Sequence, residues 1–210
     1  MAVRKIYTLP KYEKLLRKKS KPVKKVNRQV RELVQDLLDT LETQAGVGLA
    51  APQIGILARV CLVMVGTDDE RDEAGGEGKT EIIPLINPEI LEEGELERGY
   101  DGCLSIPGLQ GYTRRPKTLH VRAIDMDGDT VEYLFEGFDA RVAAHEIDHL
   151  DGILYFDRLD TLEDLYYMVE DEEEEGKIAF LAYLDVHPEL RLTPDKREEL
   201  PTRGVKTIMD

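Results

Sequence analysis

Two histidines and a glutamate in the stretch AAHEIDHLDG could bind a metal ion and move a proton. His145 and His149 are four residues apart, so on an α-helix both imidazoles lie on one face. Two neutral imidazoles at this spacing can bind a divalent transition metal, with Glu146 beside them as a candidate proton carrier. The competing interpretation is a pair of partly exposed histidines on an ordinary amphipathic helix. A metal site therefore needs a third ligand and a pocket from elsewhere in the chain.

Two glycine-containing stretches offer further candidates. Cys103 lies in YDGCLSIPG, where it is better placed to bind a metal than Cys61, which we expect to be a small buried residue of an apolar strand. Gln53 is the one side chain of GVGLAAPQIG that can both donate and accept hydrogen bonds. This stretch lacks the Lys-Ser/Thr pair of a phosphate loop and the third glycine of a dinucleotide fingerprint. Taken alone it favours a tight turn that packs on the core, with close backbone approach to a ligand as the alternative.

The composition indicates one globular domain with a core and room for an appendage. The chain has 210 residues, of which 41% are hydrophobic, and no apolar run approaches the roughly 20 residues that cross a membrane. No apolar segment follows the basic N-terminal residues, and two cysteines are too few for a disulfide framework. We therefore expect a reduced, cytoplasmic protein without a signal peptide or a membrane partner.

The charge is distributed unevenly along the chain. The net charge is −15, but residues 1–31 carry +11 and the remainder carries −26. So acidic a chain repels phosphates, and no specific nucleic-acid binding is expected. The basic segment KLLRKKSKPVKK either contacts RNA or, as we favour, is solvated or docked on the acidic surface of the protein itself.

Hydrophobic periodicity predicts the elements before the cysteine. Apolar residues recur with helical spacing and predict a helix over residues 25–44 that is ended by Gly46. RVCLVMV (59–65) and EIIPLIN (81–87) are predicted strands, and the polar, glycine-rich stretch between them is expected to be a mobile loop. Residues 89–100 are expected to be extended.

The elements after the cysteine include the helix with the histidines. LHVRAIDMDGDTVEYLF predicts a β-hairpin that turns at Asp127-Gly128. Its aspartates also suggest calcium, but the glycine comes too early for an EF-hand and no glutamate closes the loop, so the hairpin is favoured. The helix is expected to begin at Asp139 as its N-cap, to end at Gly152 and to be largely buried.

Beyond about residue 165 the sequence pattern changes. Residues 170–175 are six acids, which should repel one another out of regular packing. The apolar segment IAFLAYLDV after them is expected to dock as a helix or a strand, and the last residues are expected to fray. We divide the chain into a catalytic domain, residues 1–165, and an acidic C-terminal extension, residues 166–210, that is partly docked or flexible.

Three motifs taken together resemble a known family. GVGLAAPQ (46–53), DGCLS (101–105) and HEIDH (145–149) resemble the three signature motifs of the peptide deformylases, in order and at similar separations. The similarity extends to RKKSKPV (17–23), INPEI (86–90) and LDGILYFDRL (150–159), so that it covers roughly residues 5–160. Any one motif would be weak evidence, whereas the three together are specific.

The resemblance implies an α+β fold with mixed and antiparallel strands packed around a central metal-binding helix. It implies one metal ion per chain held by Cys103, His145 and His149, with water in the fourth position. Family members commonly use Fe(2+), for which Zn, Ni or Co can substitute. Attack of the metal-bound hydroxide would be assisted by Glu146 as general acid/base, and the amide of Gln53 with the backbone N–H of Leu104 would bind the developing oxyanion.

The resemblance also implies the substrate, the N-formylmethionine terminus of newly synthesised polypeptides, from which formate is released. The peptide would add as a strand beside Val47 and Gly48, with Gly102 and Leu104 on its other side. Its methionine would enter a pocket lined by Val47, Phe138, the stem of Arg141, Val142 and His145, although ordinary core packing explains Phe138 and Val142 equally well. A monomer is expected, and the ribosome near its exit tunnel is a candidate partner.

The chain departs from the family pattern at three places. Asp101 stands where the family commonly has glutamate, an acid expected to pair with Arg115, and the shorter side chain could loosen this pair. Ala144 replaces a usual glutamine. The acidic C-terminal extension is atypical and puts a role of the C-terminus in ribosome docking in doubt.

Two other functions compete with this assignment. A zincin-type metalloprotease shares H-E-x-x-H but needs a glutamate or histidine ligand further along the chain, and it leaves Gln53 and the Gly-Cys loop unexplained. A non-catalytic relative would be an interaction module, against which the full set of candidate ligands argues.

Overall fold

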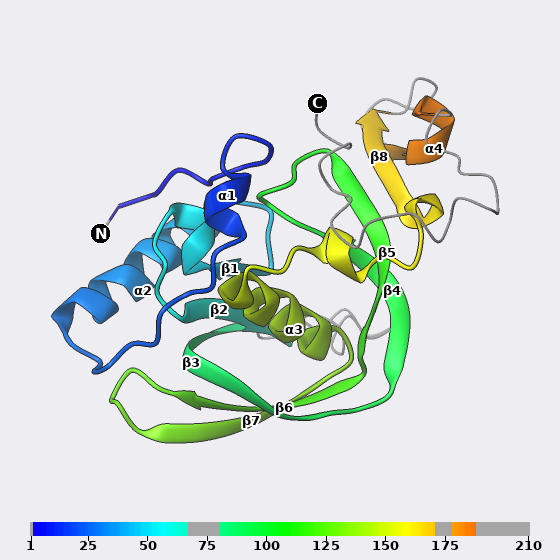
Figure 1. The fold of residues 1–210 in the computed structure, drawn as a ribbon. Coiled ribbons are helices and arrows are strands. Elements are labelled where there is room, and N and C mark those ends of the chain that lie inside the picture. The colour runs from blue at the N-terminus through cyan, green and yellow to red at the C-terminus, as the bar shows by residue number, and fades with distance from the viewer. Residues whose placement is uncertain (1, 67–79, 171–177, 188–210) are drawn as a thin grey trace.

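The computed structural model describes residues 2–66, 80–170 and 178–187 (Figure 1). The helices are α1 (Glu13–Leu16), α2 (Arg28–Leu41), α3 (Gly137–Asp151) and α4 (Tyr183–Val186), with 3₁₀ turns at Ala51–Ile54, Tyr155–Arg158 and Leu162–Asp164. The strands are β1 (Gly48–Ala50), β2 (Val60–Val65), β3 (Glu81–Glu93), β4 (Leu96–Gly102), β5 (Leu109–Pro116), β6 (Thr118–Ile124), β7 (Thr130–Glu136), β8 (Leu165–Glu170) and β9 (Ile178–Ala182).

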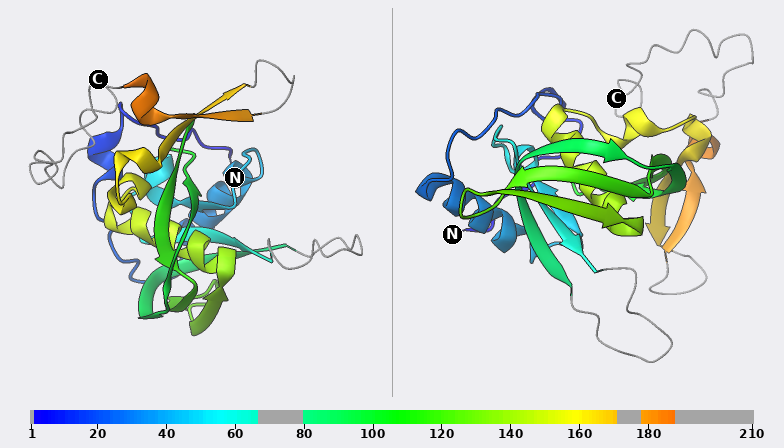
Figure 2. Two further views of the ribbon diagram at one scale, coloured as in Figure 1. Left: turned by 90° about the vertical axis from the view of Figure 1, so that its right-hand side faces the viewer. Right: turned by 90° about the horizontal axis from the view of Figure 1, so that it is seen from below.

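The strands form two sheets, in the orders β1-β2-β3-β6-β7 and β4-β5-β8-β9 (Figure 2). All neighbouring strands in this part of the chain are antiparallel, and the parallel pairing among the described residues is the isolated bridge between Lys21 and Ala58. The predicted α+β class is therefore confirmed, with strand pairing that is antiparallel rather than mixed within the sheets.

Helix α3 lies between the two sheets (Figure 1). Its small and branched residues, among them Ala140, Ala143 and Ile147, pack on the buried face of the first sheet. Burial of this apolar surface is the main force that fixes the helix in place. The predicted stop at Gly152 is confirmed, since this glycine is in the left-handed conformation with φ 74°.

The predicted N-cap of α3 is wrong. Glu136, the last residue of β7, is the N-cap, and the chain turns into the helix at Gly137 with φ 54°. Asp139 lies in the first turn instead, where its carboxylate accepts a hydrogen bond of 3.0 Å from the N–H of Gly66. The strand leads directly into the helix, so no separate capping residue is needed between them.

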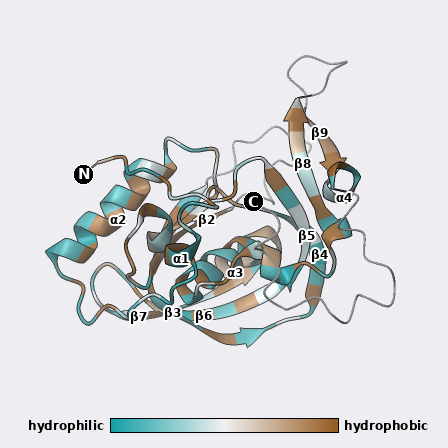
Figure 3. Ribbon diagram, turned by 45° about the horizontal axis from the view of Figure 1, so that its top comes forward, coloured by the Kyte–Doolittle hydropathy of each residue, from teal (hydrophilic) through white to brown (hydrophobic). Residues whose placement is uncertain are grey.

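Helix α2 is shorter than predicted because its ends are set by caps and turns. Asn27 accepts a hydrogen bond of 3.1 Å from the N–H of Val30 and starts the helix. After Leu41 the chain tightens into turns at Thr43 and Gln44, so the helix ends before Gly46. The predicted apolar stripe is confirmed, and hydrophobic and hydrophilic bands alternate along α2 in Figure 3.

The strand predictions are largely confirmed. Cys61 is fully buried in β2, and the hairpin turns where expected, with Asp125 accepting hydrogen bonds from the N–H groups of three following residues. Strand β3 continues beyond its predicted end to Glu93. The stretch GVGLAAPQ is not a simple tight turn, because it forms edge strand β1 followed by a 3₁₀ turn.

The segment after residue 164 adds strands to the second sheet. Strand β8 pairs with β5, and β9 pairs with β8, so the apolar segment IAFLAYLDV docks as a strand followed by the short helix α4. The expectations for the glycine-rich loop, for most of the six acids and for the last residues concern residues 67–79, 171–177 and 188–210, which lie outside the described residues.

The basic N-terminal segment is docked in part on the protein itself. Arg4 pairs with Asp36 at 2.6 Å, Lys19 pairs with Asp151 at 3.0 Å, and Arg17 pairs with Asp157. In the described part of the chain, no helix combines the length and the apolar character needed to span a membrane.

Substitution of Gly152 tests how tightly α3 is joined to the N-terminal segment. A Cβ at Gly152 would collide with the backbone carbonyl of Arg17, whereas a Cβ at Gly128, also with positive φ, would meet no atom within 4 Å. We expect Gly128→Ala to cost about 1 kcal/mol and Gly152→Ala roughly 2–4 kcal/mol, measured by urea unfolding. Equal losses in the two variants would contradict the predicted collision.

Candidate functional site

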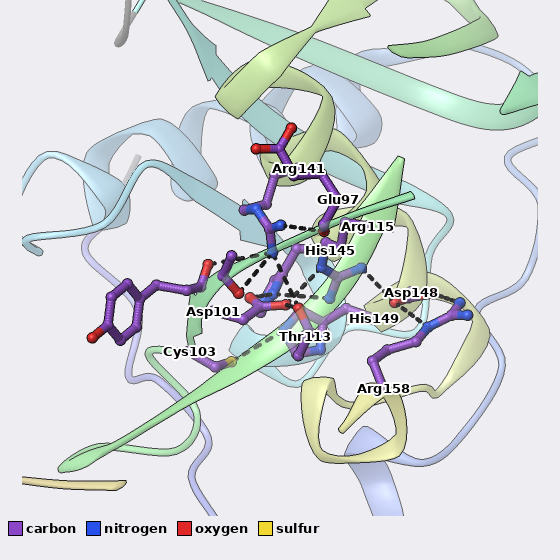
Figure 4. Close-up of polar contacts among 12 residues, drawn as sticks. Glu97, Asp101, Cys103, Thr113, Arg115, Arg141, His145, Asp148, His149 and Arg158 are labelled. Carbon is purple, nitrogen blue, oxygen red and sulfur yellow. Dashed lines mark hydrogen bonds and ion pairs between the residues drawn. The ribbon is translucent and has the colours of Figure 1, made fainter. Parts of the chain in front are cut away.

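The three predicted metal ligands converge between β4 and α3. Cys103 follows the last residue of β4, and its Sγ lies 3.2 Å from Nε2 of His149 on α3. The candidate ligand atoms of Cys103, His145 and His149 all lie within 4.8 Å of one another. Figure 4 shows the side chain of Cys103 pointing toward the histidines. Cys103 precedes the histidines by more than 40 residues in the sequence, and packing of the second sheet on α3 brings them together.

Asp101 orients the first imidazole. Its Oδ1 lies 2.6 Å from Nδ1 of His145, which leaves Nε2 of that ring as the nitrogen available to a metal. Burial disfavours a charged His145, but the facing carboxylate outweighs this effect and holds the pKa of His145 well above its usual range. Burial lowers the pKa of His149, which favours the neutral ring that a metal requires.

A chain of charged side chains, buried up to the partly exposed Arg158, fixes Asp101 in turn. Arg115 on β5 donates to Asp101 at 2.6 Å and to Asp148 at 2.8 Å, and Arg158 donates to the other oxygen of Asp148 at 2.6 Å (Figure 4). The expected pair between Asp101 and Arg115 is therefore present, and the shorter side chain does not loosen it. Burial opposes ionisation of Asp101, yet the facing imidazole of His145 and the guanidinium of Arg115 hold its pKa below its usual range.

Sequence reasoning missed two of these roles. The contact of Asp101 with His145 was not anticipated, and Asp148 was not singled out. The available signal was spacing, because Asp148 follows His145 by three residues and so shares its helix face. Ala144 is buried in the apolar core cluster that contains residues of the first sheet.

Glu146 is buried beside the cleft. Its Oε2 has no hydrogen-bond partner among the described atoms, and a Cβ at Gly48 would lie 2.6 Å from its Oε1. Glycine at position 48 is thus what allows β1 to approach this carboxylate. Burial raises the pKa of Glu146 to about 7. A carboxyl with such a pKa can accept and return a proton near neutral pH.

Gln53 is held with its amide group toward Cys103. Its Oε1 accepts a hydrogen bond of 2.7 Å from the N–H of Ala50, which turns Nε2 toward Ser105 Oγ at 3.3 Å and Cys103 Sγ at 3.5 Å. Gln53 occupies the 3₁₀ turn after β1 and is buried. The orientation of its donor is therefore set by the backbone of the same turn.

A cleft of about 480 Å³ opens beside these groups. All the residues predicted to contact substrate line it, namely Val47, Gly48, Gly102, Leu104, Phe138, Arg141 and Val142, as do Gln53, Cys103, His145 and Glu146. The guanidinium of Arg141 donates to the carbonyls of Glu97, at 2.9 Å, and Gly99, at 3.2 Å, so it holds β4 against α3. Val142 also belongs to the core beneath the cleft, with Phe138 packed against it, so core packing is present at these two residues and their contact with substrate stays a prediction.

The residues present fit a divalent transition metal. A thiolate and two imidazoles suit Fe, Zn, Ni or Co, and a three-residue set leaves a position open to a reacting molecule, as in catalytic rather than structural sites. Glu146 adds a buried carboxylate oxygen without a partner beside this donor set.

Comparison with known proteins identifies the family. The profile described as Polypeptide deformylase matches residues 3–164. The peptide deformylase of Thermomicrobium roseum is 42% identical over 180 residues, which cover 85% of this chain and 98% of that protein. The chain therefore belongs to the peptide deformylase family, enzymes that remove the N-formyl group from newly synthesised peptides.

Solved structures agree with this assignment. Ehrlichia chaffeensis peptide deformylase in complex with actinonin is 33% identical, with a TM-score of 0.68 over 78% of this chain and 92% of that one. The class I type b peptide deformylase from Acinetobacter baumannii, bound to Met-Ala-Ser, is 32% identical, with a TM-score of 0.66 over 75% of this chain and 100% of that one.

Replacement of Arg115 tests the buried charge chain. Arg115→Met leaves the carboxylates of Asp101 and Asp148 buried with fewer partners, so we expect a loss of about 3–5 kcal/mol in the free energy of unfolding, measured with urea. The control Arg114→Met removes an exposed pair with Asp160 and is expected to change stability little. Equal losses of unfolding free energy in the two variants would show that the buried ion pairs of Arg115 contribute no more to stability than an exposed pair.

Proposed function

We propose that this chain hydrolyses the formamide bond of N-formylmethionyl peptides at a single divalent metal held by Cys103, His145 and His149. The observation that carries the proposal is the approach of Cys103 Sγ to His149 Nε2, at 3.2 Å, in a chain of this family. Fe(2+) is the proposed native ion, with Zn, Ni or Co as substitutes, because a soft thiolate with two imidazoles accepts all four. When bound, the ion would supply a water molecule acidic enough to serve as nucleophile near neutral pH.

Glu146 is the proposed general acid/base. It takes the proton of the attacking water and returns it to the nitrogen of the departing amine, which must be protonated to leave. Its burial and its place between Gly48 and the histidines support this role, since a substrate in the cleft would lie against it.

Gln53 and the backbone N–H of Leu104 are the proposed donors to the oxyanion that forms at the formyl carbon. Preorganised donors of this kind contribute about 3–4 kcal/mol each to stabilisation of a transition state. Support comes from the amide of Gln53, which is held toward Cys103 by its own backbone contact.

The peptide is proposed to bind as an added strand. Among the described strands, β1 and β4 are both edge strands, and Gly48 and Gly102 on them both line the cleft. Their free edges offer main-chain partners to an extended peptide, and such pairing does not depend on side chains. The Met-Ala-Ser ligand of the Acinetobacter baumannii relative is a peptide of the expected chemistry. The proposed methionine pocket comprises Val47, Phe138, the stem of Arg141, Val142 and His145.

Neither rival function accounts for this arrangement as well. A metalloprotease of the zincin type needs an additional ligand that Cys103 already supplies here, and a non-catalytic module would not need Glu146 in the cleft. We propose a monomer that meets its substrates in the cytoplasm, near the ribosomal exit tunnel. Residues 166–210 are proposed to form an extension that is docked in part.

Two substitutions separate metal binding from proton transfer. Glu146→Ala is expected to retain the metal but to lower kcat for formate release from formyl-Met-Ala-Ser by about 10²–10⁴, since only the general base is removed. Cys103→Ala is expected to lose the metal, measured by elemental analysis of anaerobically purified protein. Cys61→Ala, the matched cysteine control, should keep both metal and activity. Normal turnover in Glu146→Ala would refute the proposed base.

Gln53→Leu tests stabilisation of the oxyanion. The substitution removes the amide donor and is expected to reduce kcat by about 10²–10³ with little change in KM, because the donor acts mainly on the transition state. A raised KM with unchanged kcat would instead assign Gln53 to ground-state binding.

A further inference from the structure

Aromatic side chains gather on one face of the second sheet. The register pairs Tyr100 on β4 with Tyr112 on β5, and alternation along the strands places Tyr166 of β8 and Phe180 of β9 on the same face. The opposite face carries buried residues such as Leu109 and Thr113. We refer to Tyr100, Tyr112, Tyr166 and Phe180 as the aromatic face.

The four rings form a connected set. The ring centroids are 4.0 Å apart for Tyr100 and Tyr112, 6.0 Å for Tyr112 and Tyr166, and 6.0 Å for Tyr100 and Phe180. Strands β4 and β9 are the two edges of this sheet, and in a flat sheet they would be about 14 Å apart. Contact between Tyr100 and Phe180 therefore shows that the sheet curls toward the aromatic face.

The two outer rings of this face are exposed, whereas the guanidinium of Arg98 lies over Tyr112, 4.0 Å from its ring centroid. Tyr100 is 48% exposed and Phe180 is 47% exposed. Hydrophobic residues are seen along β8 and β9 in Figure 3. A contiguous exposed group of rings on a soluble domain commonly marks a binding surface, because rings expose a large apolar area that a partner can cover.

The aromatic face is continuous with the cleft. Tyr100, Gly102, Gln110 and Met168 all line the cleft, and strand alternation places all four on the face that carries the rings. Met168 pairs with Phe180 in the register of β8 and β9. Phe180 therefore lies on the strand next to Met168 at the edge of the cleft, one strand spacing or about 5 Å away.

We propose that the aromatic face extends the peptide site and binds apolar and aromatic side chains of substrate residues beyond the first three. This inference rests on the proposed function. Strand β9 lies two strand spacings from Gln110 on β5, about 10 Å, and Phe180 is offset by two residues along it, so an extended peptide covers the path with about four residues. The family profile ends at residue 164, so Tyr166, Met168 and Phe180 are contributed by the segment that follows it. The extension thus gives this chain a preference among longer substrates that main-chain pairing alone does not provide.

The test compares substrates of two lengths in variants of one strand. The short substrate is formyl-Met-Ala-Ser, and the long one adds Ala-Phe-Leu-Phe to it. In Phe180→Ala the KM for the long peptide, relative to that for the short one, is expected to rise about tenfold, with kcat unaltered. Leu181→Ala is the matched control, because Leu181 is the next residue and equally exposed, at 47%, but lies on the opposite face. Its KM ratio should equal that of the unmodified protein.

Phe180→Leu keeps an apolar side chain on β9 and is the variant to use if Phe180→Ala does not fold. Its KM for the long peptide, relative to that for the short one, is expected to rise about threefold. An unchanged ratio in both Phe180 variants, or an equal rise in Leu181→Ala, overturns the proposal. If light scattering shows that Phe180→Ala dissociates an oligomer while the ratio stays constant, the face joins copies of the chain and the proposal is wrong. Absence of formate release from the short peptide in the unmodified, metal-loaded protein would count against the proposed function instead.

Discussion

Asp101 accepts hydrogen bonds from Arg115 and Thr113 on β5 and contacts His145 on α3, so one carboxylate connects the second sheet to the helix. It lies two residues before Cys103. The position of the sulfur relative to both histidines therefore depends on this contact. A buried carboxylate is costly unless it is paired. The groups that pair with Asp101 come from β5 and α3, the two elements whose relative position sets the geometry of the site. The same contacts of Asp101 thus stabilise the junction between the sheet and the helix and determine the geometry of the site.

The two sheets contribute differently to the site. The first sheet buries the small residues of α3 and thereby sets the orientation of the face that carries His145 and His149. The second sheet brings Cys103 to that face, with Arg141 holding β4 by its backbone carbonyls. The cleft lies between β1 and β4, which are edge strands of the two described sheets. Rigid elements, rather than loops alone, therefore position the reactive groups, as precise sites require.

The sequence predicts those features that depend on neighbours along the chain. Helical spacing of His145 and His149, the stripe of α2 and the Asp-Gly turn of the hairpin are all local, and the structure contains each of them. The convergence of Cys103 with the histidines is not local, and it was expected only from resemblance to a family. The N-cap of α3 was missed because β7 leads directly into the helix, and the role of Asp148 was missed because its partner Arg115 lies on β5, far from α3 in the sequence.

The two cysteines of the chain lie in opposite environments. Cys61 is sealed within β2, and burial raises the pKa of its thiol well above the usual value, whereas Cys103 borders the cleft and is partly accessible. Because the reactive form of cysteine is the thiolate, alkylating and oxidising reagents will discriminate strongly between them. Covalent labelling of the folded protein therefore reports on the sulfur of Cys103 alone. The labelling rate depends on whether this sulfur is bound to another group or accessible to the reagent.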